Sequence, residues 1–343
     1  MKKVIIIGGG FVGSYAARKL EKNFDVTLID TKDFFEFTPG VLRTIVEPDH
    51  LQKLQIKHTE YLKKTEVIVD RVTKITENEA YIGNKKYPFD YLIVASGSSY
   101  GSRIKEQDIM LAARGEHMRE AYTAVQNAKD IVIVGGGLVG VELAAEMATH
   151  CQSKNITLVQ SGPALIERNP LKSQKYVENF LRRHNVSIVF NERITSKAGD
   201  FCFTEQGKRM KADVLFMCTG IKPNSEFLKG FDSALDKKQF VKVNEYMQVN
   251  GFSNIFAPGD INDVAVEKTA QNSAHQAAVA VDNILRLEKR RSLRTYTPKK
   301  TPLCISMGKY AGVLEWGGFV FTGLFPALVK AVIELKEMFS IRH

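Results

Sequence analysis

Two stretches of this 343-residue chain place the same arrangement of glycines directly after an apolar run. In such a G-x-G-x-x-G pattern the first glycine makes a tight strand-to-helix turn, the second lets the backbone approach a pyrophosphate, and the third lets the helix pack closely on the strand. An Ala-rich helical pattern follows each copy, which argues against glycines that only close a turn. The chain therefore contains two candidate dinucleotide sites, at Gly8, Gly10 and Gly13 and at Gly135, Gly137 and Gly140.

The residue at the end of each following strand-like run indicates what each site binds. Rossmann-type units place an acidic residue about 20 positions beyond the glycines, where it accepts hydrogen bonds from the ribose hydroxyls. Asp30, at the end of DVTLID, fits this role. The second unit has Gln160 instead, which can bind a 2′-hydroxyl but does not repel a 2′-phosphate, and Arg168 and Lys172 follow it. We expect NADH at the second site, with NADPH left open.

The elements that must position these residues alternate between strand and helix. This alternation predicts an α/β fold with parallel sheets. Helices are expected at Ser173–His184 and Thr269–Leu287, whereas the turn sequences within Glu66–Pro88 and Phe201–Lys211 predict short antiparallel hairpins. Strands are expected at Val4–Ile7, Val26–Ile29, Tyr91–Ala95, Ile131–Val134, Ile156–Val159, Val186–Phe190, Val214–Cys218 and Asn254–Ala257.

Composition narrows the class of protein. With 44% hydrophobic and 25% charged residues, the chain is ordinary globular protein with the length for two or three domains. Its four cysteines show neither paired nor metal-like spacing, which predicts free thiols in a reducing compartment. Met1-Lys2-Lys3 leads directly into a strand, so we expect no signal peptide and a cytoplasmic protein, with peripheral contact to a membrane left open.

The net charge of +10 is compatible with several anionic partners. The densest cationic run, Arg286–Lys300, is either a solvated helix end and linker or a contact with an anionic membrane surface. No nucleic-acid-binding module accompanies the charge, so we do not expect a nucleic-acid partner.

Three further motifs bring the chain close to a known family: YLIVASGSS at 91–99, FMCTGIKPNSEF at 216–227 and SNIFAPGDI at 253–261. With the two glycine patterns they resemble the flavoprotein reductases that bind two dinucleotides. Within these the chain looks most like type II NADH:quinone oxidoreductases and ferroptosis suppressor (apoptosis-inducing-factor-like) proteins. The resemblance implies two interleaved Rossmann-like domains, as in glutathione reductase: an FAD domain at 1–101 and 221–294, an NAD(P)H domain at 102–220, and a small C-terminal α+β module at 295–343.

The same resemblance implies the binding residues. Asp260 would bind the ribitol, Arg43 the flavin nucleotide and Glu142 the nicotinamide half of the donor. Lys268, near a helix start, would favour the anionic reduced flavin at its pyrimidine edge; a solvated charge is the alternative. The FAD set is Gly8, Gly10, Phe11, Val12, Gly13, Asp30, Arg43, Val72, Ala95, Gly97, Gly259, Asp260 and Lys268. The NAD(P)H set is Gly135, Gly137, Leu138, Val139, Gly140, Glu142, Gln160 and Gly220.

The acceptor is inferred from what the chain lacks and from one helix. There is no Cys-x-x-Cys motif, and KDFFEFTPGVLR stands where disulfide reductases carry a redox-active pair, which disfavours a dithiol relay. TAQNSAHQ at 269–276 resembles the helix that borders the quinone pocket of type II dehydrogenases. Its glutamines are five positions apart, where the family has four, so Gln271 and His275 are weak candidates beside Lys268.

We therefore expect an FAD-dependent NAD(P)H:quinone oxidoreductase. The alternatives are a flavoprotein reductase of a protein or sulfur acceptor, and a redox-sensing flavoprotein with little turnover.

The C-terminal segment indicates whether the protein could contact a membrane, where quinones reside. The uncharged run at Gly317–Val329 is shorter than the about 20 residues that span a bilayer, so no transmembrane helix is expected. Apolar residues then recur at helical spacing, which predicts an amphipathic helix. Its apolar face contacts a membrane surface, the protein's own core or a second copy of the chain; the residues concerned are Phe325, Leu328, Val332, Leu335 and Phe339.

Overall fold

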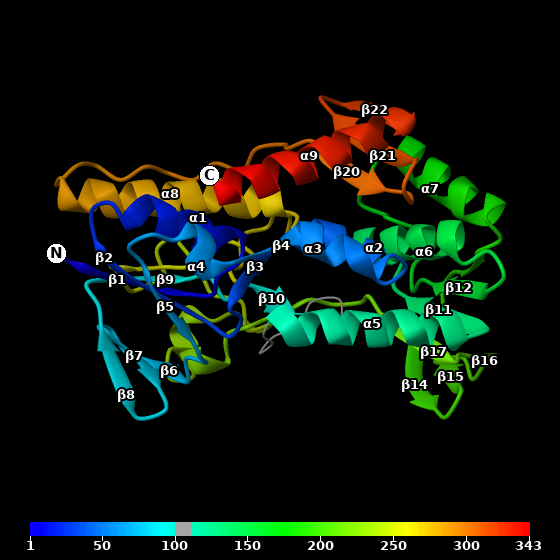
Figure 1. The fold of residues 1–343 in the computed structure, drawn as a ribbon, viewed down its shortest axis with the longest axis horizontal. Helices are drawn as coiled ribbons and strands as arrows, with labels where there is room; N and C mark the ends of the chain where they lie inside the picture. The colour runs from blue at the N-terminus through cyan, green and yellow to red at the C-terminus, as the bar shows by residue number, and fades with distance from the viewer. Residues whose placement is uncertain (100–110) are drawn as a thin grey trace.

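The computed structural model describes residues 1–99 and 111–343 as an elongated molecule with two lobes (Figure 1). The first lobe is built on a parallel sheet with strand order β19-β9-β1-β2-β5. Helices α1 (Phe11–Leu20) and α8 (Ala270–Glu288) lie together on one face of it. The strands are β1 (Lys3–Ile7), β2 (Asp25–Asp30), β5 (Glu66–Val69), β9 (Tyr91–Val94) and β19 (Ile255–Phe256).

The second lobe repeats this plan with a parallel sheet of order β13-β12-β11-β17. Helices α6 (Leu138–His150) and α7 (Leu171–Arg183) cover one face of the sheet, and α5 (Leu111–Asn127) runs from the middle of the molecule along this lobe (Figure 1). The strands are β11 (Asp130–Val134), β12 (Asn155–Val159), β13 (Ser187–Val189) and β17 (Val214–Met217). The expected doubly repeated α/β architecture is confirmed.

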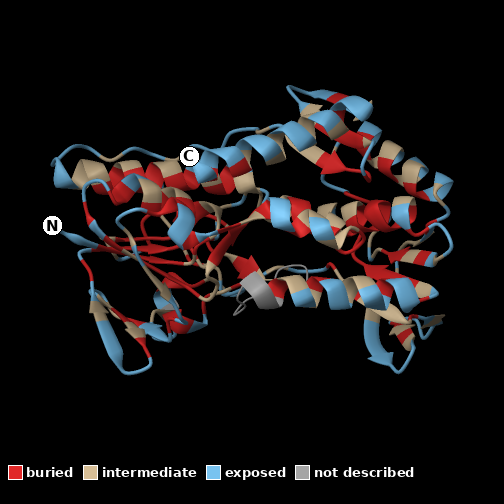
Figure 2. Ribbon diagram, in the orientation of Figure 1, coloured by how far each residue is buried: buried red, intermediate tan, exposed pale blue. Residues whose placement is uncertain are grey.

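Parallel register brings the carboxyl ends of the central strands to one edge in each lobe. Ile7 of β1 stands opposite Ile29 of β2 and Val94 of β9, and Val134 of β11 stands opposite Val159 of β12 and Met217 of β17. Ligands of open α/β sheets bind outside these ends. Most residues of β1, β2, β9, β11 and β12 are buried, as Figure 2 shows in red.

Two short strands mark a crossing of the chain between the lobes. The strands β10 (Ser98–Ser99) and β18 (Lys222–Pro223) pair antiparallel where it leaves and returns. The expected boundary at 101–102 lies outside the described residues, and that at 220–221 falls just before β18; the domain division stays a prediction. One apolar core cluster includes residues of both lobes and of the C-terminal strands, which joins the parts of the chain into one packed body.

Smaller antiparallel sheets decorate the lobes. The hairpin expected within Phe201–Lys211 is present, but that within Glu66–Pro88 is only partly correct. Glu66–Val69 is β5 and pairs in parallel with β2 in the main sheet, because Val67 packs beside Leu28 on one face of the sheet and Ile68 beside Ile29 on the other. The sheets are β6 (Lys74–Ile75), β7 (Glu79–Ile82) and β8 (Lys85–Pro88); β14 (Ile194–Ala198), β15 (Phe201–Thr204) and β16 (Arg209–Lys211); and β3 (Phe34–Glu36) with β4 (Gln55–Lys57).

A C-terminal module closes the chain as an α+β unit. Its sheet is formed by β20 (Leu303–Ser306), β21 (Gly312–Trp316) and β22 (Phe319–Gly323), and α9 (Leu324–Arg342) packs against it. Helix α9 also meets the short helices α3 (Leu51–Leu54) and α4 (His58–Tyr61), while α2 (Val41–Thr44) packs on α6. Among the helices of the described residues, none has the length and apolar character needed to cross a bilayer.

Candidate dinucleotide sites

The first glycine turn has the geometry that its sequence predicts. Gly8 has a φ of +99°, and a Cβ there would lie 2.5 Å from the Ala95 carbonyl oxygen at the end of β9. A Cβ at Gly13 would lie 1.8 Å from the carbonyl oxygen of Gly8, so the helix touches the turn. Around Gly10, in contrast, a Cβ would meet nothing within 4 Å. Two glycines thus permit close packing, and the middle one faces open space.

The second turn reproduces this arrangement. Gly135 has a φ of +109°, and its Cβ would lie 2.9 Å from the Cys218 carbonyl oxygen. A Cβ at Gly140 would lie 1.8 Å from the carbonyl oxygen of Gly135, and Gly137 again faces open space. The two glycine motifs therefore build the same cradle in two lobes.

Both cradles leave backbone donors free for a ligand. Phe11 and Val12 are the first two residues of α1, and Leu138 and Val139 are the first two of α6. Neither helix has a side-chain hydrogen bond at its N-cap glycine. Unpaired N–H groups and the positive end of the helix dipole favour a phosphate at such a terminus. The residues present therefore fit a dinucleotide pyrophosphate at both turns.

Asp30 ends β2 as expected, and a buried histidine that sequence reasoning missed lies behind it. The Nε2 atom of His58 is 3.1 Å from Asp30 Oδ2, and its Nδ1 atom is 2.7 Å from the Tyr61 hydroxyl. Burial opposes the charge of Asp30, but the His58 hydrogen bond and the nearby Lys32 hold its pKa below the usual value. An ionised Asp30 takes Nε2–H as a donor, so the Tyr61 hydroxyl donates to Nδ1. This arrangement fixes the carboxylate.

The turn after β19 brings Asp260 to the first cradle. Gly259 has a φ of +96°, and its Cβ would lie 2.8 Å from a methyl group of Val12. Asp260 accepts hydrogen bonds from Ser98 at 3.0 Å and Ser273 at 3.3 Å. The predicted FAD residues Ala95, Gly97 and Asp260 are thus brought to one strand edge, with Gly97 at a φ of +65°. Val72 is buried in a core cluster.

The side chain of Gln276 stabilises the turn at Gly259–Asn262 through hydrogen bonds. Its Oε1 atom accepts from Gly259 N at 2.7 Å and from Asn262 Nδ2 at 2.6 Å, and the side chain is buried. Gln271 and His275 of the same helix are exposed, so the five-residue spacing does place the two glutamines on different faces. Sequence reasoning took Gln276 only as a motif residue; its burial could not be read from the motif.

Lys268 precedes α8, whose N-cap is Thr269. Its ammonium donates to the carbonyl oxygens of Asn262 at 2.6 Å and Val264 at 3.3 Å. Burial lowers the pKa of Lys268, although Asp260 and Asp263 oppose this. The Lys268 ammonium is therefore held by the loop between Gly259 and Thr269. Its contact with the flavin stays a prediction.

Arg43 and Glu146 join the two lobes. The guanidinium donates to the buried carboxylate through Nη2 at 3.0 Å, and the Ser306 hydroxyl of β20 donates to the same oxygen at 3.3 Å. Burial disfavours the charge of Arg43, but Glu146 raises its pKa above the usual value. Arg43 thus has a partner on α6, and the expected flavin contact stays a prediction.

Glu142 joins α6 to the C-terminal module. Its Oε1 atom accepts from Ser306 N at 2.7 Å and from the Lys330 ammonium of α9. Lys330 is a partner that the sequence did not indicate, because 188 positions separate it from Glu142. The carboxylate expected to hold the nicotinamide half is therefore tied to the C-terminal module.

Gln160 directly follows β12 (Asn155–Val159) at the second cradle. Its Oε1 atom accepts from Gly136 N at 2.9 Å. Gly220 lies beyond β17 with a φ of +63°. Gln160 is thus held by its own glycine turn.

All four cysteines are free. Burial raises the pKa of Cys304 to about 11 and that of Cys218 to about 12, so both thiols stay protonated near neutral pH. The surroundings of Cys304 and Cys218 therefore do not favour the thiolate form.

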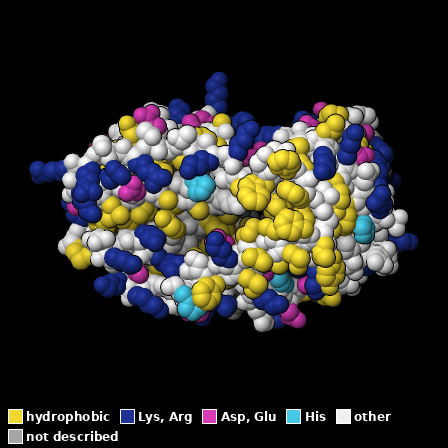
Figure 3. Space-filling model, turned by 90° about the horizontal axis from the view of Figure 1, so that it is seen from above, with side chains coloured by type: hydrophobic (Ala, Val, Ile, Leu, Met, Phe, Trp, Pro, Cys, Tyr) yellow, Lys and Arg dark blue, Asp and Glu magenta, His cyan; other side chains and the backbone are white. Residues whose placement is uncertain are grey.

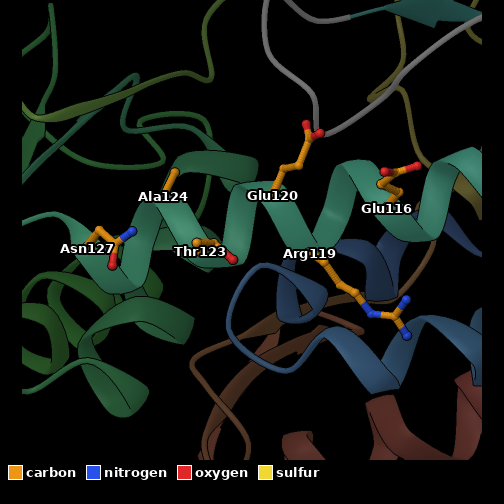
Figure 4. A pocket seen from close by; sticks show the side chains of 6 residues that line it. All are labelled: Glu116, Arg119, Glu120, Thr123, Ala124 and Asn127. Atoms are coloured by element: carbon orange, nitrogen blue, oxygen red, sulfur yellow. The ribbon is translucent and has the colours of Figure 1, made fainter.

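A hollow lies along α5, and no residue of either glycine turn lines it. Figure 4 shows Glu116 and Glu120 on one side of the helix and Arg119 on the opposite side. The residues that line it all lie on α5, and their side chains do not point toward a common centre. The hollow is therefore not a candidate site.

Comparisons with known proteins agree with this geometry. A family model described as pyridine nucleotide-disulphide oxidoreductase matches residues 2–283. Ferroptosis suppressor protein 1 of Homo sapiens is 32% identical, with 96% of this chain and 92% of the relative covered. Apoptosis-inducing factor homolog B of Dictyostelium discoideum is 30% identical, with 100% of this chain and 96% of the relative covered.

Two solved structures share the fold. The sulfide:quinone oxidoreductase of Aquifex aeolicus superposes with a TM-score of 0.84 at 18% identity, covering 100% of this chain and 92% of that chain. NDH2 of Plasmodium falciparum, in complex with NADH, superposes with a TM-score of 0.84 at 15% identity, covering 99% and 96%. At these identities the likeness concerns the fold alone.

The role of Gln276 can be tested against Gln271 on the same helix. A Gln276→Leu variant leaves Gly259 N and Asn262 Nδ2 without their acceptor, so we expect about 1–3 kcal/mol less stability and weaker FAD binding. Urea unfolding and FAD fluorescence measure the two effects. Gln271→Leu, on the exposed face, is the control and should change neither; equal effects of the two substitutions would contradict the assignment.

Proposed function

Since the chain belongs to the pyridine nucleotide-disulphide oxidoreductase family, we propose that it transfers electrons from NAD(P)H through FAD to a quinone. The chain is an FAD-dependent oxidoreductase with a pyridine nucleotide as electron donor. The observation that supports two separate nucleotide ligands is the pair of matching glycine cradles, each with an uncapped helix N-terminus. We assign FAD to the cradle at Gly8–Gly13 and the donor to that at Gly135–Gly140, because only the first is joined by the Gly259–Asp260 turn.

A quinone fits the acceptor side better than a thiol. The four cysteines are free, three are buried, and Cys304 donates to the Pro326 carbonyl oxygen at 3.3 Å. Sulfide:quinone oxidoreductase and NDH2 share the fold. We assign the acceptor side to the C-terminal module. It contacts α6, the helix of the second cradle, through hydrogen bonds from Ser306 and Lys330 to Glu142.

The chain's own residues serve to bind and orient. When bound, FAD supplies the chemistry by accepting a hydride and passing the electrons on one or two at a time. The N–H groups at the uncapped helix starts beside Gly10 and Gly137 would hold the pyrophosphates, and Asp260 is oriented by hydrogen bonds from Ser98 and Ser273. Glu142 positions the nicotinamide half, while Lys268 places a positive charge near the start of α8. No protein nucleophile is required.

We further propose that α9 and β22 rest on a membrane surface, where quinones reside. The apolar side chains of this face are largely exposed, with Leu328 at 57% and Leu335 at 71%. Figure 3 shows apolar side chains gathered on the side of the molecule that carries α9. Interfacial helices bury such a face in the headgroup region without spanning the bilayer. The exposed members are Phe319, Phe321, Leu324, Phe325, Leu328, Val332, Leu335 and Phe339.

Anaerobic stopped-flow absorbance tests the proposed reaction. We expect NADH or NADPH to bleach the flavin rapidly, and a soluble ubiquinone analogue or menadione to restore its absorbance rapidly. Ferredoxin and a disulfide substrate serve as controls and should restore it slowly. Bleaching without recovery on quinone would contradict the quinone assignment, and slow bleaching with both nucleotides would favour a redox sensor.

Vesicle sedimentation tests the membrane surface. We expect the protein to pellet with vesicles of mixed neutral and anionic phospholipid. A Leu328→Glu/Leu335→Glu variant should bind at least about tenfold more weakly, because two exposed leucines that would be buried in the lipid are replaced by charged residues. Val69→Glu, exposed in the first lobe, is the control. Absence of binding together with a dimer that the double variant dissociates would assign the face to a homodimer instead.

A further inference from the structure

The segment after β12 is fixed against the second glycine turn. Ile166 N donates to the Gly136 carbonyl oxygen at 2.8 Å, and Leu165 and Ile166 are both buried. Ile166 adopts a φ of 41°, an uncommon conformation for a β-branched residue. A Cβ at Gly136 would lie 2.6 Å from a methyl group of Leu165, so this segment packs directly on the turn. The residue that follows, Glu167, is therefore held at a defined place.

Glu167 places a carboxylate beside Gln160, the amide residue at the end of β12. Its Oε1 atom accepts from Gln160 Nε2 at 2.9 Å, while Gln160 Oε1 accepts from Gly136 N at 2.9 Å. Gly162 makes room for it, because a Cβ there would lie 1.6 Å from Glu167 Oε1. Gln160 and Glu167 thus form one unit in which the amide is oriented by the turn and the carboxylate lies beyond it.

The cations expected to attract a 2′-phosphate are turned to other partners. Lys172 donates to the Val320 carbonyl oxygen at 2.8 Å. Arg168 pairs with Glu267 at 3.4 Å, with 87% of its side chain exposed. Glu192 adds a second carboxylate beside the same strand end: its N–H donates to the Gln160 carbonyl oxygen at 3.2 Å, and its Oε2 atom is buried without a hydrogen-bond partner.

We propose that Glu167 makes the second cradle specific for NADH over NADPH. This inference rests on the proposed function, in which the second glycine turn binds the donor. Rossmann units distinguish the two nucleotides at this strand end, where a carboxylate accepts a hydrogen bond from the ribose 2′-hydroxyl and repels a 2′-phosphate. Here Glu167 supplies the carboxylate seven positions beyond the strand end, and Gln160 aligns it.

The test compares two variants that act on the same carboxylate in different ways. Glu167→Gln removes its charge, whereas Gly162→Ala keeps the charge but forces the carboxylate to move. Glu178→Gln is the control, because Glu178 is a partly exposed carboxylate of α7 paired with Arg182. Two readouts are used with the FAD-loaded protein: the affinities for NAD⁺ and NADP⁺ by calorimetry, and the rate constants of flavin bleaching by NADH and NADPH.

We expect the starting protein to prefer NADH by at least about tenfold, the scale of one like-charge contact. Both site variants should narrow this preference by about tenfold, chiefly through tighter NADP⁺ binding and faster bleaching by NADPH. The control should keep the original preference. Unchanged FAD content and far-ultraviolet circular dichroism verify that the variants are folded.

Two results would overturn the inference. One is a preference that neither site variant changes. The other is a starting protein that binds NADP⁺ as well as NAD⁺, which would point to Arg168 as a phosphate ligand. Failure of the proposed function differs from both, because neither nucleotide would then bind or bleach the flavin.

Discussion

The rest of the structure depends on one close contact, which occurs in both lobes. The third glycine of each motif lets a helix touch the turn that precedes it. In each lobe the third glycine places its α-carbon so close to the carbonyl of the first that a Cβ would lie 1.8 Å away, at Gly13 over Gly8 and at Gly140 over Gly135. This contact sets the helix N-terminus at the strand edge. The N–H groups there then have neither a capping side chain nor a bulky neighbour, which is the condition for binding a pyrophosphate.

The two cradles can cooperate only if the lobes keep a defined relation, and buried polar contacts supply it. Arg43 of the first lobe and Ser306 of the C-terminal module both bind Glu146 of α6, and Lys330 of α9 binds Glu142 one turn earlier. Such pairs add little net stability because of their desolvation cost, but breaking one leaves an uncompensated charge. They therefore fix the relative positions of α6, the first lobe and the C-terminal module.

Much of the fold could be predicted from the sequence, because local patterns determine it. The two glycine turns, both parallel sheets and α8 follow from apolar periodicity and turn chemistry, and α8 begins one residue from its expected start. The strand β5 was misassigned because its pairing with β2 depends on tertiary packing. His58 behind Asp30, Lys330 on Glu142 and Glu167 on Gln160 carry no local signal. Each acts through a contact between segments that only the folded chain brings together.

The measurement that tests the central claim most directly is the ligand content of two matched variants, Gly8→Ala and Gly135→Ala. Bound FAD per chain is determined by absorbance and NAD⁺ affinity by calorimetry. If each cradle has its own ligand, Gly8→Ala loses FAD, whereas Gly135→Ala keeps one FAD per chain, loses NAD⁺ binding and is still reduced by dithionite. Loss of the same ligand in both variants, or loss of FAD alone in Gly135→Ala, would contradict the assignment of two cradles to two dinucleotides.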